Sequence, residues 1–411
     1  MRMKTTMNCG KLLRRLLTLC LFLAMTAGCA CAENILEMRN ESIAWLHYEC
    51  TLPDGRMLLA GGTQQEPGSD KTGEWLVCLN RDRTVSWEYT APPADEYSEG
   101  CSGAALMEDG TIAVLLEEAP HDGKGTAFTV QFFTQDGKPA GKKTALPAEL
   151  MSVYQADRSG VMLTGSSNMG AGTEVVDWNG NKTAQYEGYV MPGGWGGRIP
   201  GDGYVLYGQR NGRAVIMKTD GPQGVTLWET ALDYKWPDTG EAQLFDAVKT
   251  TDGGYAALLY EIKAGTGQTT YERRTALVKL DQEGQVQWIK KNSDEDNTRY
   301  TLSAYNGKLV MYPKEPTAMD TPQSLRWFDE KGNELGTTEL TVKPEECAGV
   351  TNRPVPENVT AQEPPKTSPL TMIPMEDGLW ALTLGFINGD AGNGYNETVC
   401  MEPILIRVPE L

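Results

Sequence analysis

The chain has 411 residues, and its 55 acidic side chains outnumber its 37 basic ones to give a formal net charge of −18 at pH 7. Nucleic acid and anionic membrane surfaces repel a chain this acidic, so both are poor partners. After residue 32, no stretch approaches the roughly 18 consecutive apolar residues that a membrane-spanning helix needs, so no transmembrane segment is expected there.

Residues 1–32 are predicted to be a secretory signal peptide, because five basic residues precede an apolar run from Leu16 to Met25. The small residues Ala30 to Ala32 fit ordinary cleavage before Glu33. The sequence TAGC, which ends at Cys29, resembles a lipoprotein box with threonine where leucine is usual. Two outcomes stay open: a freely secreted, extracellular protein, which we expect, and a protein anchored at the cell surface by a lipid on Cys29.

The rest of the chain contains a short motif that recurs seven times. Each copy is a turn that ends in glycine, followed by a short apolar run, which is typical of hairpins with buried strands. The seven turns are Pro53–Gly55, Glu108–Gly110, Arg158–Gly160, Gly201–Gly203, Thr251–Gly253, Tyr305–Gly307 and Glu376–Gly378.

A second turn follows in six of the copies, as in LNRDRTVSW and LDQEGQVQW. Five of these turns carry a glycine that supplies positive φ, and Arg83 takes that position in the first copy. Each copy therefore predicts four antiparallel strands. Because the first-turn glycines are 43 to 71 residues apart, we predict one all-β domain over residues 33–411, a seven-bladed β-propeller.

Three copies carry a tryptophan on the strand after the second turn: Trp87, Trp228 and Trp288. We interpret these side chains as wedges against the neighbouring blade, since a large flat ring buries much apolar surface. The alternative is stacking on a carbohydrate. Gly141, Ala184 and Gly336 take the same position in other copies, where weaker blade contacts are expected.

The runs LVKLDQEGQVQWIKK, WLVCLNRDRTVSWEY and MKTDGPQGVTLWET resemble the repeat of bacterial secreted propellers of the quinoprotein-like and WD40-like type. The resemblance implies the fold and says little about activity. Quinoprotein enzymes commonly have eight units and a vicinal cysteine pair, whereas this chain has seven units and no adjacent cysteines. No cofactor is therefore expected, and propellers that bind partner proteins are the closer analogy.

The seventh copy ends after its third strand, Glu402 to Val408, which would leave an exposed sheet edge. The segment Asn34 to Ser42 belongs to no copy and alternates as a short strand does. We therefore predict that the last blade is closed by this N-terminal strand.

The loops opposite the tight turns vary most, and binding residues usually lie on long loops of a rigid scaffold. The longest loop is a proline-rich insertion at 343–370, between copies six and seven, which either lies across this face or is a solvated spacer. The residues expected around the channel mouth on this face offer aromatic and charged side chains suited to a sugar or a peptide. These candidate binding residues are His47, Tyr97, Trp195, Arg198, Asp246, Arg299 and Tyr300. The alternative is that they only plug the channel.

Five cysteines follow the signal segment, with spacings unlike those of metal sites: Cys50, Cys78, Cys101, Cys347 and Cys400. One disulfide at most is expected, and Cys347 with Cys400 is the first pair to consider. The only two histidines, His47 and His121, offer little for a metal site or a catalytic triad.

These patterns predict a monomeric, non-catalytic binding or scaffold propeller for an extracellular protein or glycan. Two alternatives remain. One is a polysaccharide hydrolase or lyase, since 55 acidic residues allow many carboxylate pairs. The other is a structural module of a cell-envelope assembly.

Overall fold

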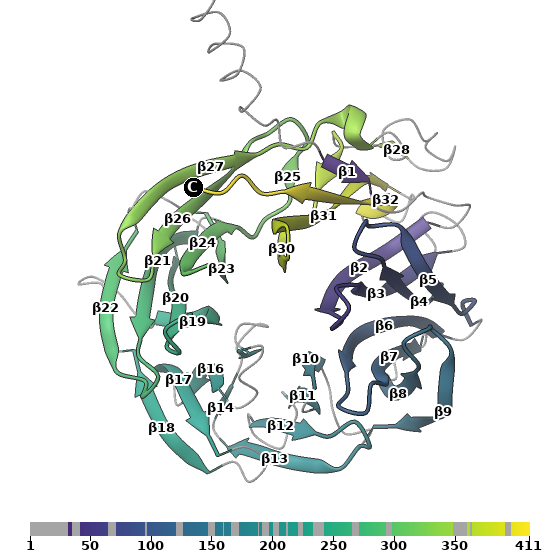
Figure 1. Cartoon of the computed structure of the whole chain (residues 1–411), viewed down its shortest axis with the longest axis horizontal. Coiled ribbons are helices and arrows are strands. Elements are labelled where there is room, and N and C mark those ends of the chain that lie inside the picture. The colour runs from purple at the N-terminus through teal and green to yellow at the C-terminus, as the bar shows by residue number, and fades with distance from the viewer. Residues whose placement is uncertain are drawn as a thin grey trace, which may run out of the picture.

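The fold is seen in a computed structural model of the chain. The structure describes residues 32–34, 42–64, 71–94, 97–120, 126–146, 153–158, 160–165, 172–187, 189–190, 197–199, 205–210, 213–220, 225–232, 242–264, 271–292, 298–347, 360–361, 364–390 and 396–411. These residues form seven antiparallel sheets arranged as blades around a ring (Figure 1). The prediction of an all-β, seven-bladed propeller is confirmed. A search of this part of the chain for a helix long and apolar enough to cross a membrane finds none.

In blades 1 to 6 the strands run in chain order from the centre of the ring to its rim (Figure 1). Blade 1 contains β2 (Ser42–Thr51), β3 (Met57–Gln64), β4 (Thr72–Leu79) and β5 (Val85–Thr90). Blade 2 contains β6 (Tyr97–Leu106), β7 (Ile112–Pro120), β8 (Ala127–Phe133) and β9 (Pro139–Ala145). Blade 3 contains β10 (Val153–Asp157), β11 (Gly160–Gly165), β12 (Gly172–Val176) and β13 (Lys182–Glu187). Blade 4 contains β14 (Tyr189–Val190) and β15 (Gly197–Arg198), which both pair with β16 (Val205–Arg210), then β17 (Arg213–Thr219) and β18 (Thr226–Ala231).

Blades 5 and 6 follow the same order, whereas in blade 7 the outer strand is β1 (Ala32–Asn34), from the beginning of the chain. Blade 5 contains β19 (Ala242–Lys249), β20 (Tyr255–Ala264), β21 (Tyr271–Leu280) and β22 (Val286–Lys291). Blade 6 contains β23 (Tyr300–Tyr305), β24 (Lys308–Pro313), β26 (Gln323–Asp329) and β27 (Glu334–Leu340). Blade 7 contains β30 (Thr371–Met375), β31 (Gly378–Asp390), β32 (Asn396–Arg407) and β1 (Ala32–Asn34).

The recurring aspartates of the motif shape the turns. In seven turns an aspartate carboxylate accepts the backbone N–H two residues later at 2.9–3.1 Å, which satisfies a donor that the sheet leaves unpaired. These residues are Asp54, Asp82, Asp109, Asp177, Asp252, Asp281 and Asp329. Arg83 has a φ of 68°, which confirms that it takes the left-handed position of the missing glycine.

The three motif tryptophans pack on the turn of the following blade, as predicted. A Cβ on Gly137 of blade 2 would lie 2.5 Å from the Trp87 ring, and one on Gly284 of blade 5 would lie 2.5 Å from the Trp228 ring. Trp288 packs in the same way on the blade 6 turn, where its indole Nε1 donates to Glu330 O at 3.1 Å. Each of these turns therefore leaves room for a ring only because it lacks a side chain.

The N-terminal strand closes the ring, but at a different place in the sequence. β1 pairs antiparallel with β32 over residues 32–34, whereas the predicted strand was Asn34 to Ser42. Residues 35–41 lie outside the described residues. On the turn side, blade 1 holds blade 7 through Arg83, which donates to Asp377 Oδ2 at 2.8 Å and lies 3.7 Å over the Trp380 ring.

The proline-rich insertion adds strands to blade 7, so its described part is more than a spacer. β28 (Thr360–Ala361) and β29 (Lys366–Thr367) both pair with β31, and β29 also pairs with β25 (Thr317–Ala318), which lies between β24 and β26 of blade 6. A 3-10 helix, η2 (Pro344–Cys347), precedes them. Cys347 is a buried thiol, so the disulfide suggested with Cys400 is not formed. Cys50, Cys78 and Cys101 are also thiols.

Candidate functional site

The sequence-predicted binding residues that the structure describes lie on or beside the innermost strands of their blades (Figure 1). His47 is on β2, Asp246 on β19 and Tyr300 on β23, which Arg299 directly precedes. Trp195 lies outside the described residues, as do the side chains of Tyr97 and Arg198. The structure therefore places the described candidates in two groups, one on blade 1 and one on blades 5 and 6.

Asp246 is the centre of a hydrogen-bond network that joins three blades. Its Oδ1 accepts Ala247 N at 2.9 Å and faces the Tyr207 hydroxyl of blade 4 at 3.5 Å, while its Oδ2 accepts Leu302 N at 2.9 Å and the Thr301 hydroxyl of blade 6. Burial raises the pKa of Asp246, although these hydrogen bonds oppose the shift. This carboxylate fastens the inner strands together.

Tyr300 and Arg299 differ in what they can offer a ligand. Tyr300 is buried among hydrophobic residues of blades 5 and 6, and its carbonyl accepts the Tyr260 hydroxyl at 2.9 Å, so its ring belongs to the blade contact. Arg299 is partly exposed, with its Nε 3.9 Å from Glu315 Oε1. Of this pair, only Arg299 presents a side chain to solvent.

His47 is exposed on blade 1, apart from the Asp246 network. The surrounding protein nevertheless lowers the pKa of its imidazole by desolvation, so the neutral ring is favoured. Whether any of these residues binds a ligand stays a prediction.

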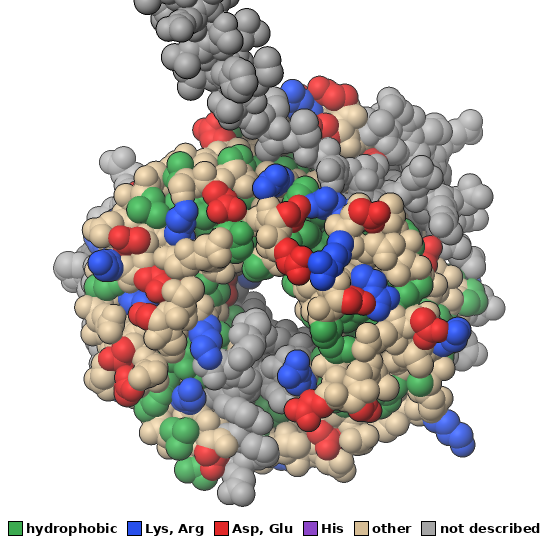
Figure 2. All heavy atoms as spheres, in the orientation of Figure 1, with side chains coloured by type: hydrophobic (Ala, Val, Ile, Leu, Met, Phe, Trp, Pro, Cys, Tyr) green, Lys and Arg blue, Asp and Glu red, His purple; other side chains and the backbone are tan. Residues whose placement is uncertain are grey.

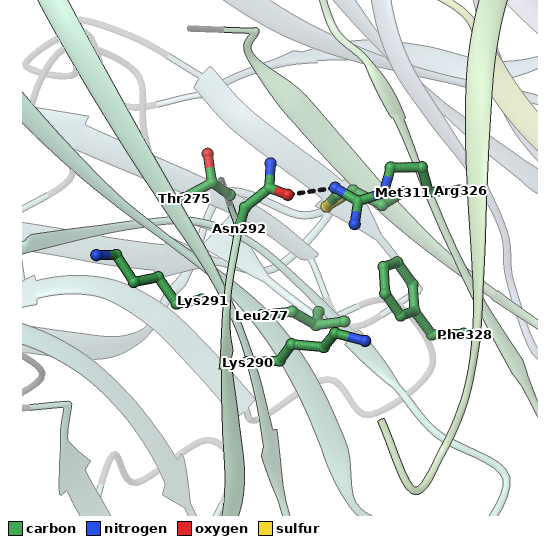
Figure 3. Close-up of a pocket in the computed structure, with 8 residues that line it drawn as sticks. All are labelled: Thr275, Leu277, Lys290, Lys291, Asn292, Met311, Arg326 and Phe328. Carbon is green, nitrogen blue, oxygen red and sulfur yellow. Dashed lines mark hydrogen bonds between the residues drawn. The ribbon is translucent and has the colours of Figure 1, made fainter. Parts of the chain in front are cut away.

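A pocket that the sequence did not predict lies between the outer strands of blades 5 and 6 (Figure 3). It is shallow and open: the space that can hold the centre of a water molecule is about 10 Å³, room for about one water or one small polar group. Apolar side chains and hydrogen-bond donors share its lining, which consists of Thr275, Leu277, Lys290, Lys291, Asn292, Met311, Arg326 and Phe328.

Hydrogen bonds and ion pairs fix the positions of the two cations of this pocket, Arg326 and Lys290. Arg326 donates from Nε and Nη2 to the two carboxylate oxygens of Glu334 at 3.0 and 3.1 Å, and from Nη1 to Asn292 Oδ1. Lys290 Nζ donates to Gly332 O at 3.1 Å, and it lies 3.9 Å from the same carboxylate. The Phe328 ring lies beneath both cations, with Lys290 Nζ 4.9 Å and Arg326 Cζ 5.3 Å from its centroid.

The pocket is rich in donors and poor in acceptors. Its cations are Lys290 and Arg326, whereas the side chain of Lys291 points away from them (Figure 3). One carboxylate, Glu334, is adjacent, and its pKa is lowered chiefly by the hydrogen bond from Arg326. Thr275 is buried at this site and lies beside the Tyr260 hydroxyl. A locally positive, donor-lined pocket in a strongly acidic protein suits an anionic oxygen group.

The sequence held only a weak signal for this pocket. Lys290 and Lys291 end the motif run, and Arg326 follows 35 residues later on another blade, so only the blade contact brings them together. A search of the described side chains for three or more potential metal ligands gathered in one place finds no such group.

No family model matches the chain, and neither does any curated protein. Similar solved structures include a protein of unknown function from Dyadobacter fermentans, with 12% identity and a TM-score of 0.41, over 92% of this chain and 98% of that one. The Dos1 propeller has 10% identity and a TM-score of 0.42, over 92% and 94% of the two chains. Prolyl oligopeptidase B from Galerina marginata has 10% identity and a TM-score of 0.43, over 84% of this chain but only 47% of its own length. The protein is thus a seven-bladed β-propeller by its own strand order, and the resemblance to quinoprotein-like repeats stays a prediction.

Proposed function

We propose that this protein is a secreted or surface-tethered, non-catalytic propeller that binds an extracellular protein or glycan. The observation that supports the proposal is the pocket between blades 5 and 6, where fixed donors converge over an apolar floor. Binding sites commonly combine an apolar lining with a few well-placed polar groups. The stacked blades hold these groups in position before a ligand arrives, which lowers the cost of binding.

A thermal-shift screen of the full chain against oligosaccharides and cell-envelope extract tests this function. A ligand that binds only the folded state at 100 times its Kd adds about 2.7 kcal/mol of stability. We expect a saturable rise in melting temperature without any product. Release of product from a ligand in the screen would instead identify an enzyme.

One observation favours the polysaccharide hydrolase as a second candidate. Between blades 1 and 2, the buried Glu74 accepts Lys143 Nζ at 2.7 Å, and Glu99 lies close to this pair. Burial, and then the charge of Glu74, raise the pKa of Glu99. Glycosidases use two neighbouring carboxyl groups, one of which has a raised pKa.

Turnover of chromogenic glycosides tests this second candidate. If the cluster is catalytic, Glu99→Gln should abolish turnover, whereas Glu108→Gln, on an exposed turn of blade 2, should leave it unchanged. Absence of turnover by the unaltered protein across the panel would remove the candidate.

A further inference from the structure

We propose that the rim of blade 5 binds an extended acidic segment of a protein partner, which adds to the open edge of β22 and places one carboxylate in the pocket beside Lys290. The inference rests on the proposed binding function and names its ligand class. β22 is the outermost strand of its sheet, so among the described residues one of its two backbone edges pairs with no strand. An extended peptide can hydrogen-bond to such an edge.

The exposed side chains of β22 include apolar residues and, at its C-terminal end, two lysines. Val286 and Ile289 are apolar and exposed, with 41% and 38% of their surface accessible. Lys290 and Lys291 follow, and of the two only Lys290 points into the pocket, toward Phe328 (Figure 3). Exposed apolar side chains next to cations favour a polypeptide, which carries both apolar and acidic groups, over an acidic polysaccharide, which lacks the apolar ones.

Lysines on an edge strand ordinarily discourage pairing with another copy of the same chain. The outer strand of blade 2 has two, Lys142 and Lys143, and there Lys143 is paired with the buried Glu74 of blade 1. On blade 5, Lys290 instead contacts a backbone carbonyl and lies 3.9 Å from Glu334. The positive charge of these lysines repels the same edge of a second copy but attracts an acidic strand. A carboxylate of the partner would contact Lys290 together with Glu334.

The resident carboxylate gives the proposal a two-directional test. Removing the positive charge of Lys290 should weaken binding of an acidic peptide, whereas removing the negative charge of Glu334 should strengthen it. Because a partly exposed charge contact contributes up to about 1 kcal/mol, each substitution should change the Kd by about fivefold.

The experiment is fluorescence anisotropy with the full chain and a labelled ten-residue peptide that carries three glutamates in one half and valine and leucine in the other. The expected results are weaker binding by Lys290→Gln, tighter binding by Glu334→Gln, and no change for Lys142→Gln, a matched control on the edge of blade 2. The same peptide with glutamine in place of glutamate should bind the unaltered protein at least fivefold more weakly.

Other outcomes would overturn the proposal. The first is the same Kd for Lys290→Gln and Lys142→Gln. The second is the same Kd for the neutral and the acidic peptide. The third is tighter binding of oligogalacturonate or acetate than of the peptide. A ligand from the thermal-shift screen that stabilises the unaltered protein and Lys290→Gln equally would leave the binding function standing while removing this site. Absence of binding by every probe in both assays would remove both.

Discussion

Replacing Trp288 with alanine tests how the ring is held together. The indole packs on the turn of blade 6, where a Cβ on Gly332 would lie 3.1 Å from it, and its Nε1 donates to Glu330 O at 3.1 Å. Alanine would remove both the ring and the hydrogen bond and leave a gap between blades 5 and 6.

The expected cost follows from the burial of this side chain. A fully buried tryptophan covers roughly 150–250 Å², and Trp288 is half-buried. About 100 Å² of apolar surface at roughly 25 cal/mol per Å² gives about 2.5 kcal/mol, and the hydrogen bond adds roughly 1 kcal/mol. Trp288→Ala should therefore lower the free energy of unfolding by about 3.5 kcal/mol.

Urea denaturation followed by circular dichroism measures this change. Trp288→Phe keeps most of the ring and should lose about 1 kcal/mol, whereas Gln287→Ala, on the exposed neighbouring position, should change stability by less than about 0.5 kcal/mol. A loss below about 1 kcal/mol for Trp288→Ala would refute the view that the tryptophan holds neighbouring blades together.

Three further predictions concern buried charges and ring closure. Lys279 is fully buried and donates to both carboxylate oxygens of Asp252, at 3.0 and 2.9 Å. Despite desolvation, hydrogen bonds from Thr250 and Lys279 lower the pKa of Asp252 to about 2. Lys279→Met should lower the free energy of unfolding by about 1 kcal/mol at pH 7, a modest value because Asp252 is partly exposed. In urea titrations this difference should shrink as the pH falls from about 4 to 2, because protonation of Asp252 removes the charged partner of Lys279 in the unaltered protein. A difference that stays constant with pH would contradict this. Burial raises the pKa of Glu49 from 4.5 to about 7, so between these pH values the folded protein holds a proton that the unfolded chain releases. The free energy of unfolding should therefore fall as the pH rises from 4.5 to 7. Glu49→Gln should remove this pH dependence, and an unchanged slope of unfolding free energy against pH would argue against it. A chain that begins at Ser42 lacks β1, which leaves the edge of β32 exposed. Compared with a chain that begins at Glu33, it should unfold less cooperatively or aggregate through that edge. Equal stability of the two chains would contradict closure of the last blade by β1.

The sequence was sufficient to predict the blades because turn chemistry is local. An aspartate that accepts the N–H two residues later, and a residue with positive φ beside it, leave the same mark in every copy, including Arg83 in the place of glycine. Trp87 could be assigned to a blade contact for the same reason, since its position relative to the turn is fixed.

The N-terminal strand and the site could not be placed from local pattern. Alternation favoured Asn34 to Ser42, but the register is set by the partner strand, which pairs Ala32 with Ile406. The pocket depends on Arg326 lying across from Lys290, a contact between two blades that neither strand's own sequence reveals. Tyr300 was assigned to the channel by its position in the repeat, and the structure shows its side chain buried between blades 5 and 6.

Hydrogen–deuterium exchange of the full chain, with and without the acidic peptide, tests the central claim that ligand binds at the rim of blade 5. Because an added strand would hydrogen-bond to the open edge, amide exchange in β22 should slow when peptide is present, and so should exchange in the neighbouring segment of β26 that carries Arg326. Slowed exchange confined to the innermost strands β19 and β23, with β22 unchanged, would place the ligand in the central channel and contradict the account.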